Sequence, residues 1–211
     1  MNKNEQFVIT INRELGSGGR TIGLKLAEKL GVPFYDKAVI NALEKKYNMS
    51  VEEIEKTKGR SYTWWGEFKQ FWKDTDYSNL YAVGEMGEIT QKPTSFDLFN
   101  AEEEILSDIA EQESCVVAGR CGFYALRNHP NHLHVLIQAS MDFRVERVAR
   151  KQNMTPEEAR KTIEKVDKMR ENYVNEYTSK SRYNTRNYQL VIAADGKTED
   201  EIVELILQYV G

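Results

Sequence analysis

A glycine-rich turn directly after a short apolar run constrains the fold of this chain more than any other feature. The run Phe7-Val8-Ile9-Thr10-Ile11 is rich in β-branched residues and predicts a buried strand. The turn Gly16-Ser17-Gly18-Gly19 follows it, and apolar residues then recur at helical spacing. A second apolar run, Val32-Pro33-Phe34-Tyr35, ends at Asp36. A strand, a glycine turn, a helix and a second strand make a βαβ unit, whose crossover implies a parallel sheet.

The rest of the chain continues this alternation of strands and helices. Residues 115–118, 133–137 and 188–192 are further predicted strands. Helices are expected between them, and two of these helices begin with capping boxes at Thr155 and Thr198. The pattern predicts an α/β protein in three layers, with a mostly parallel sheet covered by helices on both faces.

Composition argues against several classes of protein. Of the 211 residues, 40% are apolar and 29% charged, which argues against disorder. The apolar stretches are far shorter than the ~20 residues of a membrane span, and the net charge of −4 argues against general binding to nucleic acid. Cys115 and Cys121 cannot form a disulfide framework, and no secretory leader is visible, so we expect a cytoplasmic protein. We expect one domain over residues 1–211, and whether its copies form a homo-oligomer stays open.

The glycine turn is a candidate phosphate-binding site. An open backbone bend aims several N–H groups at one point, and the start of the following helix adds positive potential. The strict phosphate-loop pattern G-x-x-x-x-G-K-[ST] is not met, because Arg13 stands at the first glycine and Gly19 at the lysine. Either Arg13 or Arg20 would then have to supply the missing charge.

A dinucleotide-binding turn is the rival interpretation of the same segment. The pattern G-x-G-x-x-G begins at Gly16 and Gly18 but reaches Thr21 instead of glycine. Asp36 stands where the ribose-binding acid of a nicotinamide enzyme would lie. From this segment alone, a nicotinamide-dependent oxidoreductase stays an alternative.

A cationic segment in the second half of the chain favours phosphoryl transfer. Over residues 142–170, basic side chains outnumber acidic ones although the whole chain is acidic. A phosphoryl-transfer enzyme must neutralise several phosphate oxygens, whereas a dehydrogenase gains little from such a segment. Three arginines spaced by three share one helix face, and a D-x-x-R step follows them one helix later. These residues are Arg144, Arg147, Arg150, Asp167 and Arg170.

Five segments share their residue pattern with a known family. They are Ile9–Arg20, Pro33–Lys37, Val116–Arg120, Asp142–Val148 and Asp167–Tyr173. In these segments, and over nearly its whole length, the chain resembles the cytidylate kinase-like proteins among the P-loop nucleoside monophosphate kinases. The resemblance implies a P-loop kinase fold and transfer of the γ-phosphoryl group of ATP to a nucleoside monophosphate, CMP or dCMP above others, with Mg²⁺. It also implies a helical insert over the acceptor site, about residues 51–99, and an arginine-rich lid arm, about residues 144–183.

The resemblance implies roles for residues on the donor side. The turn would wrap the phosphates of ATP, and Thr21 would be the Mg²⁺ ligand. Arg147 and Arg150 would hold the same phosphates from the lid arm, with Arg20 and Arg144 acting in catalysis. The residues of the turn are Gly16, Ser17, Gly18, Gly19, Arg20 and Thr21.

On the acceptor side, the resemblance implies that Arg120 holds the acceptor phosphate and that Asp36 belongs to the substrate site. Asp167 and Arg170 would contact both the acceptor and the transferring phosphate. Two departures from the family pattern are Gly19 in place of lysine and Cys121 in place of aspartate. A nucleotide-binding protein with a degenerate phosphate loop and little kinase activity is therefore a further alternative. The acceptor base and the contacts of the aromatic segment 61–81 stay open.

Overall fold

The structure, a computed structural model, describes residues 1–36, 38–57, 93–119 and 121–211. The chain divides into two units, one of residues 1–36 with 107–211 and one of residues 37–106. The smaller unit begins earlier and ends later than the insert expected at about residues 51–99. Most of that insert, including the aromatic segment 61–81, lies outside the described residues, as does Arg120.

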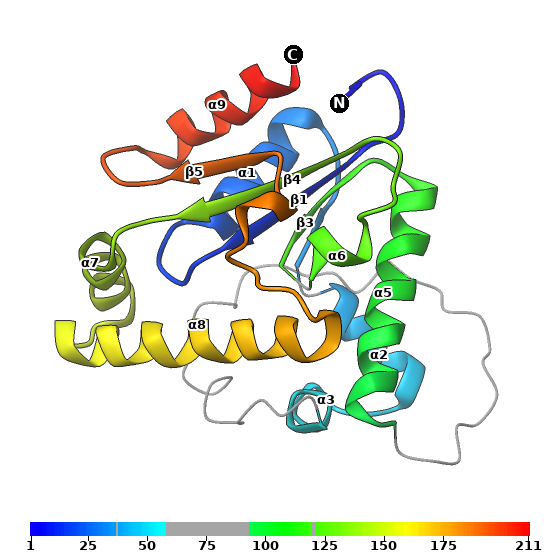
Figure 1. Cartoon of the computed structure of the whole chain (residues 1–211), viewed down its shortest axis with the longest axis horizontal. Helices are drawn as coiled ribbons and strands as arrows, with labels where there is room; N and C mark the ends of the chain where they lie inside the picture. The colour runs from blue at the N-terminus through cyan, green and yellow to red at the C-terminus, as the bar shows by residue number, and fades with distance from the viewer. Residues whose placement is uncertain (37, 58–92, 120) are drawn as a thin grey trace. The chain divides into compact units, whose positions relative to one another are not determined.

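A five-stranded parallel sheet is the frame of the larger unit (Figure 1). Its strands are β1 (Val8–Arg13), β2 (Phe34–Tyr35), β3 (Cys115–Ala118), β4 (His132–Gln138) and β5 (Leu190–Ala193). Their order is β2-β3-β1-β4-β5, and every neighbouring pair is parallel. Ile11 is paired with Ala118 of β3, and Arg13 is paired with Ile137 of β4. The carboxyl end of β1 therefore lies between the ends of two other strands, and the predicted parallel α/β fold is confirmed.

Alternate residues of β1 face two different layers of helices. Ile9 and Ile11 join the apolar core that the sheet shares with α1 (Gly19–Leu30) and α9 (Glu199–Val210). Thr10 faces the other side, where α6 (Gly122–Ala125) approaches it so closely that a Cβ on Gly122 would lie 3.1 Å from the Thr10 methyl group. Because successive strand residues point to opposite faces, this arrangement gives the predicted helical cover on both sides.

The arginine-rich segment forms two packed helices, α7 (Met141–Gln152) and α8 (Pro156–Thr178). Ser140 caps α7, and the predicted capping box of Thr155 opens α8. Val145 and Val148 of α7 pack with apolar residues of α8, and Leu15 of the glycine turn packs against the same cluster. After α8, the chain returns through a 3₁₀ turn, η2 (Thr185–Asn187), to β5. The arm that begins at Ser140 is therefore attached to the glycine turn by an apolar contact.

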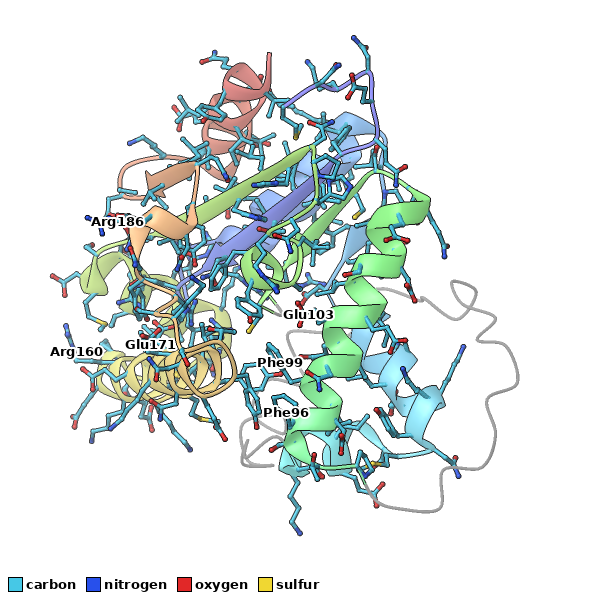
Figure 2. The ribbon with its side chains drawn as sticks, turned by 45° about the vertical axis from the view of Figure 1, so that its right-hand side comes forward. Phe96, Phe99, Glu103, Arg160, Glu171 and Arg186 are labelled. Carbon is cyan, nitrogen blue, oxygen red and sulfur yellow. The ribbon has the colours of Figure 1, made fainter. Side chains whose placement is uncertain are left out.

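Three helices contribute to the described part of the smaller unit: α2 (Ala38–Tyr47), α3 (Val51–Thr57) and α5 (Ser95–Gln112), whose last residues belong to the larger unit. Leu43, Ile54 and Leu98 are fully buried together. Phe96 and Phe99 both project from α5, one helical turn apart (Figure 2). Phe99 is buried whereas Phe96 is exposed. None of the helices described is both long and apolar enough to cross a membrane.

Candidate functional site

Two glycines in the left-handed backbone region form the bend between β1 and α1. Gly16 has φ +88° and Gly18 has φ +85°, backbone conformations that residues with a side chain rarely adopt. Gly18 is also the N-cap of α1 and has no side chain that could cap the helix. The first amides of a helix have no partner within the helix, so this bend offers several N–H groups and the positive end of a helix to an anion.

Helix α7 borders this bend closely. A Cβ on Gly16 would lie 2.9 Å from the Arg144 carbonyl oxygen, and a Cβ on Gly18 would lie 3.5 Å from Cζ of Arg147. The Arg147 guanidinium is held in place by a charge-assisted hydrogen bond to Glu199 at the start of α9. The structure thus brings the glycine bend and the arginine of a distant helix together.

Asp167 of α8 is a buried hub between the arm and the bend. One of its carboxylate oxygens accepts a hydrogen bond from Arg144 Nη1 at 2.6 Å, and the other accepts from the backbone N–H of Leu15 at 3.1 Å. Nη1 atoms of Arg170 and Arg182 lie 3.7 Å and 3.8 Å from the second oxygen. In this arrangement the carboxylate fixes the arm to the bend. A contact with an acceptor nucleotide would require it to exchange these partners.

Glu14 adds a second anchor at the same place. Its carboxylate accepts a hydrogen bond from the backbone N–H of Ala139 at 3.0 Å and lies 3.7 Å from Nε of Arg144. Arg144 is buried, and its guanidinium contacts the carboxylates of both Glu14 and Asp167. Ser17, also buried, donates its hydroxyl hydrogen bond to the Glu14 carbonyl at 2.9 Å. These contacts connect the bend to Ala139, directly after β4, and to α7.

Arg182, just after α8, is a buried arginine that sequence reasoning missed. Only 2% of its surface is exposed, and Nη2 donates to Asn12 Oδ1 at 3.2 Å and to the carbonyl of Arg13. Its backbone N–H donates to Glu171, which Figure 2 shows on α8, at 3.0 Å. Nε and Nη1 have no hydrogen-bond partner within the described residues. A single arginine in a polar stretch gives no sequence signal for such burial.

Tyr188 closes the same corner. Its hydroxyl donates to the carbonyl of Arg182 at 2.7 Å and is bound by the side-chain amide of Asn12. Burial raises the pKa of Tyr188 far above its usual value, so the hydroxyl stays protonated and can act as a donor. Phe123 of α6 packs against its ring, with centroids 5.4 Å apart.

Asp36, directly after β2, contacts two arginines that flank the bend, Arg13 at the end of β1 and Arg20 at the start of α1. It is 3% exposed. One oxygen accepts from Arg20 Nε at 2.8 Å, and the other lies 3.5 Å from Arg13 Nη2. The Arg20 guanidinium also lies over the ring of Phe34, 6.0 Å from its centroid. A ribose hydroxyl would compete with both arginines for this carboxylate.

The remaining cations of α7 differ in their positions. Arg150 is exposed and forms an ion pair with Glu146 on the same helix, at 3.7 Å. Partial burial lowers the pKa of Lys151, and the positive charge of Arg147 lowers it further, while Glu199 raises it. Lys151, which the sequence analysis did not single out, therefore belongs to the positive field around Arg147. An anion bound there would relieve the repulsion between these groups.

Comparison with family models identifies the family. The model of the cytidylate kinase-like family matches residues 8–195. The chain belongs to the cytidylate kinase-like family. The resemblance inferred from the five sequence segments is thereby confirmed. A search of curated proteins finds no match.

Solved structures support the fold of this cytidylate kinase-like protein. An uncharacterized protein from Eubacterium ventriosum ATCC 27560 is 24% identical, with a TM-score of 0.68, and the match covers 97% of this chain and 98% of that one. Shikimate kinase from Bacteroides thetaiotaomicron is 16% identical, with a TM-score of 0.55 and coverage of 97% and 98%. A gluconokinase from Sinorhizobium meliloti 1021 is 15% identical, with a TM-score of 0.51 and coverage of 97% and 91%. At these identities the likeness shows the P-loop kinase fold and leaves the substrate to be argued from the site.

Proposed function

We propose that this protein transfers the γ-phosphoryl group of ATP to a nucleoside monophosphate, with CMP and dCMP as the first candidates. The observation that carries the proposal is the meeting of the Gly16–Gly18 bend with the guanidinium of Arg147. A polyphosphate needs several backbone donors and fixed positive charge at one place, and this end of α1 supplies both. Membership of the cytidylate kinase-like family supports the same reaction class.

On the donor side, the amides at the start of α1 would bind phosphate oxygens of ATP. Thr21 lies in the first turn of that helix, and its hydroxyl is a ligand type that Mg²⁺ accepts alongside phosphate oxygens. In the described residues, no group of three or more His, Cys, Asp or Glu is arranged to hold a metal ion. Thr21 together with the nucleotide is therefore the proposed Mg²⁺ site, and the ion would neutralise charge on the phosphates.

Catalysis in this proposal depends on positioning and positive charge. Phosphoryl transfer passes through a loose transition state with charge spread over the phosphoryl oxygens, so fixed donors stabilise it without a base of unusual pKa. Arg147 and Arg20 are the proposed donors on either side of the bend, whereas Arg144 and Asp167 position the bend and the arm. Arg144 and Asp167 were expected to act directly, but their mutual burial favours a positioning role for both.

On the acceptor side, the proposed phosphate ligands are Arg120 and Arg170. Gly119 follows β3, which is the neighbour of β1 in the sheet, and Arg120 is the next residue in the chain. Ligands of open α/β sheets bind at the carboxyl ends of the strands, so an acceptor near this end would face the donor bend. Asp36 lies at the same edge, where it would act mainly by holding Arg13 and Arg20.

A substrate panel tests the proposal. Purified protein is incubated with ATP and Mg²⁺ and with CMP, dCMP, UMP, AMP or GMP, and ADP and nucleoside diphosphate are quantified. The proposal predicts a nucleoside diphosphate formed in equal amount with ADP for at least one acceptor. Binding of ATP without turnover of any acceptor would favour the nucleotide-binding alternative, which the glycine at position 19 motivates. Absence of ATP binding would contradict both functions.

A matched pair of arginine variants ties any activity to the bend. Arg147→Ala removes the guanidinium beside Gly18 and should lower turnover by about tenfold or more. Arg160→Ala, on the exposed surface of α8, removes an arginine paired with Asp142 and should leave turnover unchanged (Figure 2). Equal turnover by the two variants would show that Arg147 does not take part in the reaction.

A further inference from the structure

We propose that Arg13 supplies the positive charge that the phosphate loop lacks at position 19. The cation of the loop has in effect been transposed from the first residue of α1 to the last residue of β1. This inference rests on the proposed function, because it names the residue that replaces the lysine of the strict phosphate-loop pattern.

The side chain of Arg13 excludes any side chain at position 19. A Cβ built on Gly19 would lie 2.5 Å from Cβ of Arg13 and 3.1 Å from its Cγ. Cβ of Arg13 is attached to a backbone that is fixed in the sheet opposite Ile137 of β4. It cannot move aside as the tip of a flexible side chain could. Positions 13 and 19 therefore cannot both carry a side chain.

The same contact relates this loop to the strict pattern G-x-x-x-x-G-K-[ST]. That pattern has glycine at the position of Arg13 and lysine at the position of Gly19. Each arrangement thus has one side chain and one glycine at the contact, and in each the side chain is a cation. The two arrangements differ in which position carries the cation: position 19 in the strict pattern and position 13 in this protein.

Beyond the contact with Gly19, the Arg13 side chain crosses the carboxyl edge of the sheet. A Cβ on Gly119, after β3, would overlap Nη1 of Arg13, and Gly119 has φ +76°. Nη2 lies 3.5 Å from Oδ1 of Asp36, after β2. Two glycines leave room for the side chain, and one carboxylate orients its end. An arginine enclosed in this way, with a side chain only 13% exposed, has a fixed position at the bend.

The electrostatics of this edge favour an anion. Asp36 is shared by Arg13 and Arg20, so the three groups together carry net positive charge. Arg20 is the weaker candidate for the missing lysine, because its side chain is 32% exposed and its guanidinium lies over Phe34 of β2. Arg13 instead occupies the space where the stem of a lysine at position 19 would be.

Three variants and two measurements test the transposition. Affinity for Mg²⁺-ATP is measured by calorimetry without any acceptor, and folding is measured by urea denaturation. Arg13→Ala, which keeps Cβ and removes the charge, should fold and should bind ATP about tenfold or more weakly. Gly19→Lys should destabilise the protein because of the overlap with Arg13. The double variant Arg13→Gly with Gly19→Lys restores the first glycine and the lysine of the pattern, while Arg20 still stands at its [ST] position. It should recover both stability and ATP affinity relative to Gly19→Lys.

Two controls make the result decisive. Arg160→Ala should bind ATP as the wild type does, and Arg20→Ala should lose less affinity than Arg13→Ala. The inference is overturned if Arg13→Ala binds ATP like the wild type, if Arg20→Ala has the larger effect, or if the double variant is no better than Gly19→Lys. Because ATP binding is measured without an acceptor, failure of every acceptor in the substrate panel would contradict the proposed function and leave this test intact.

Discussion

Substitution of Gly16 by alanine should show how closely the arm and the bend are joined. Gly16 has φ +88°, and a Cβ there would lie 2.9 Å from the carbonyl oxygen of Arg144 and 3.0 Å from its Cβ. Gly31, the C-cap of α1, is a matched control. It has φ +66°, and a Cβ there would meet no atom of the described residues within 4 Å.

The two substitutions share one energetic cost and differ in another. A left-handed conformation costs an alanine about 1–2 kcal/mol, offset in part by about 0.4–1 kcal/mol from the less flexible unfolded chain. Gly31→Ala should therefore lower the free energy of unfolding by about 1 kcal/mol. Gly16→Ala adds overlap with the backbone of α7, and overpacking of this kind costs about 1–3 kcal/mol. We expect a total of about 2–4 kcal/mol for Gly16→Ala.

Urea denaturation of both variants, followed by circular dichroism, measures these free energies. Titration of the folded variants with Mg²⁺-ATP provides the functional comparison. Gly16→Ala should also weaken ATP binding, because the bend or α7 must move, whereas Gly31→Ala should bind as the wild type does. Equal loss of stability in the two variants would refute the close approach of Arg144 to the bend.

Three further predictions concern buried groups. Burial lowers the pKa of His134 to about 3, so below its ordinary pKa the unfolded state takes up a proton that the folded state does not. The free energy of unfolding should therefore fall by about 2 kcal/mol from pH 7 to pH 5. In the variant His134→Asn, urea denaturation at the two pH values should show most of this decrease abolished. A decrease as large as that of the wild type would contradict the lowered pKa of His134. Burial raises the pKa of Cys115 to about 12, so this thiol should not be alkylated in the native protein at pH 8 until urea unfolds it. Mass spectrometry of the alkylated protein tests this, and rapid labelling of the native protein would contradict the burial of Cys115. Asp167→Asn should lower the free energy of unfolding by about 3–5 kcal/mol, because it leaves buried guanidinium groups without their carboxylate. Urea denaturation measures this change, and a decrease below about 1 kcal/mol would show that Asp167 contributes little to stability.

Local sequence signals predicted the elements well where a side chain itself makes the cap. Thr155 and Thr198 cap helices as expected, since each hydroxyl accepts the hydrogen bond from the third residue of its helix. The strand at residues 115–118 has the predicted bounds because it is apolar and buried on both faces. In contrast, the last strand was expected at residues 188–192 and begins only at Leu190. Tyr188 instead caps the preceding 3₁₀ turn and binds the carbonyl of Arg182.

The local conformation of the candidate site was predictable from the sequence, whereas the contacts between its distant residues were not. The glycine pattern indicated the bend at Gly16 and Gly18, because only glycine adopts such φ values readily. The exclusion between Arg13 and Gly19 depends on the exact path of the bend in space, which residue spacing does not contain. For the same reason, the family resemblance implied a contact of Asp167 with the phosphates but not its hydrogen bond to the bend itself.

The most direct test of the account is an NMR titration of the ¹⁵N-labelled protein with a non-hydrolysable Mg²⁺-ATP analogue. The central claim is that backbone amides of the glycine bend and the start of α1 bind the polyphosphate. The account predicts that the largest shifts occur at the amides of Gly16, Gly18 and Gly19, with adenosine alone leaving them nearly unmoved. Saturable binding of the analogue with no change at these amides would contradict it.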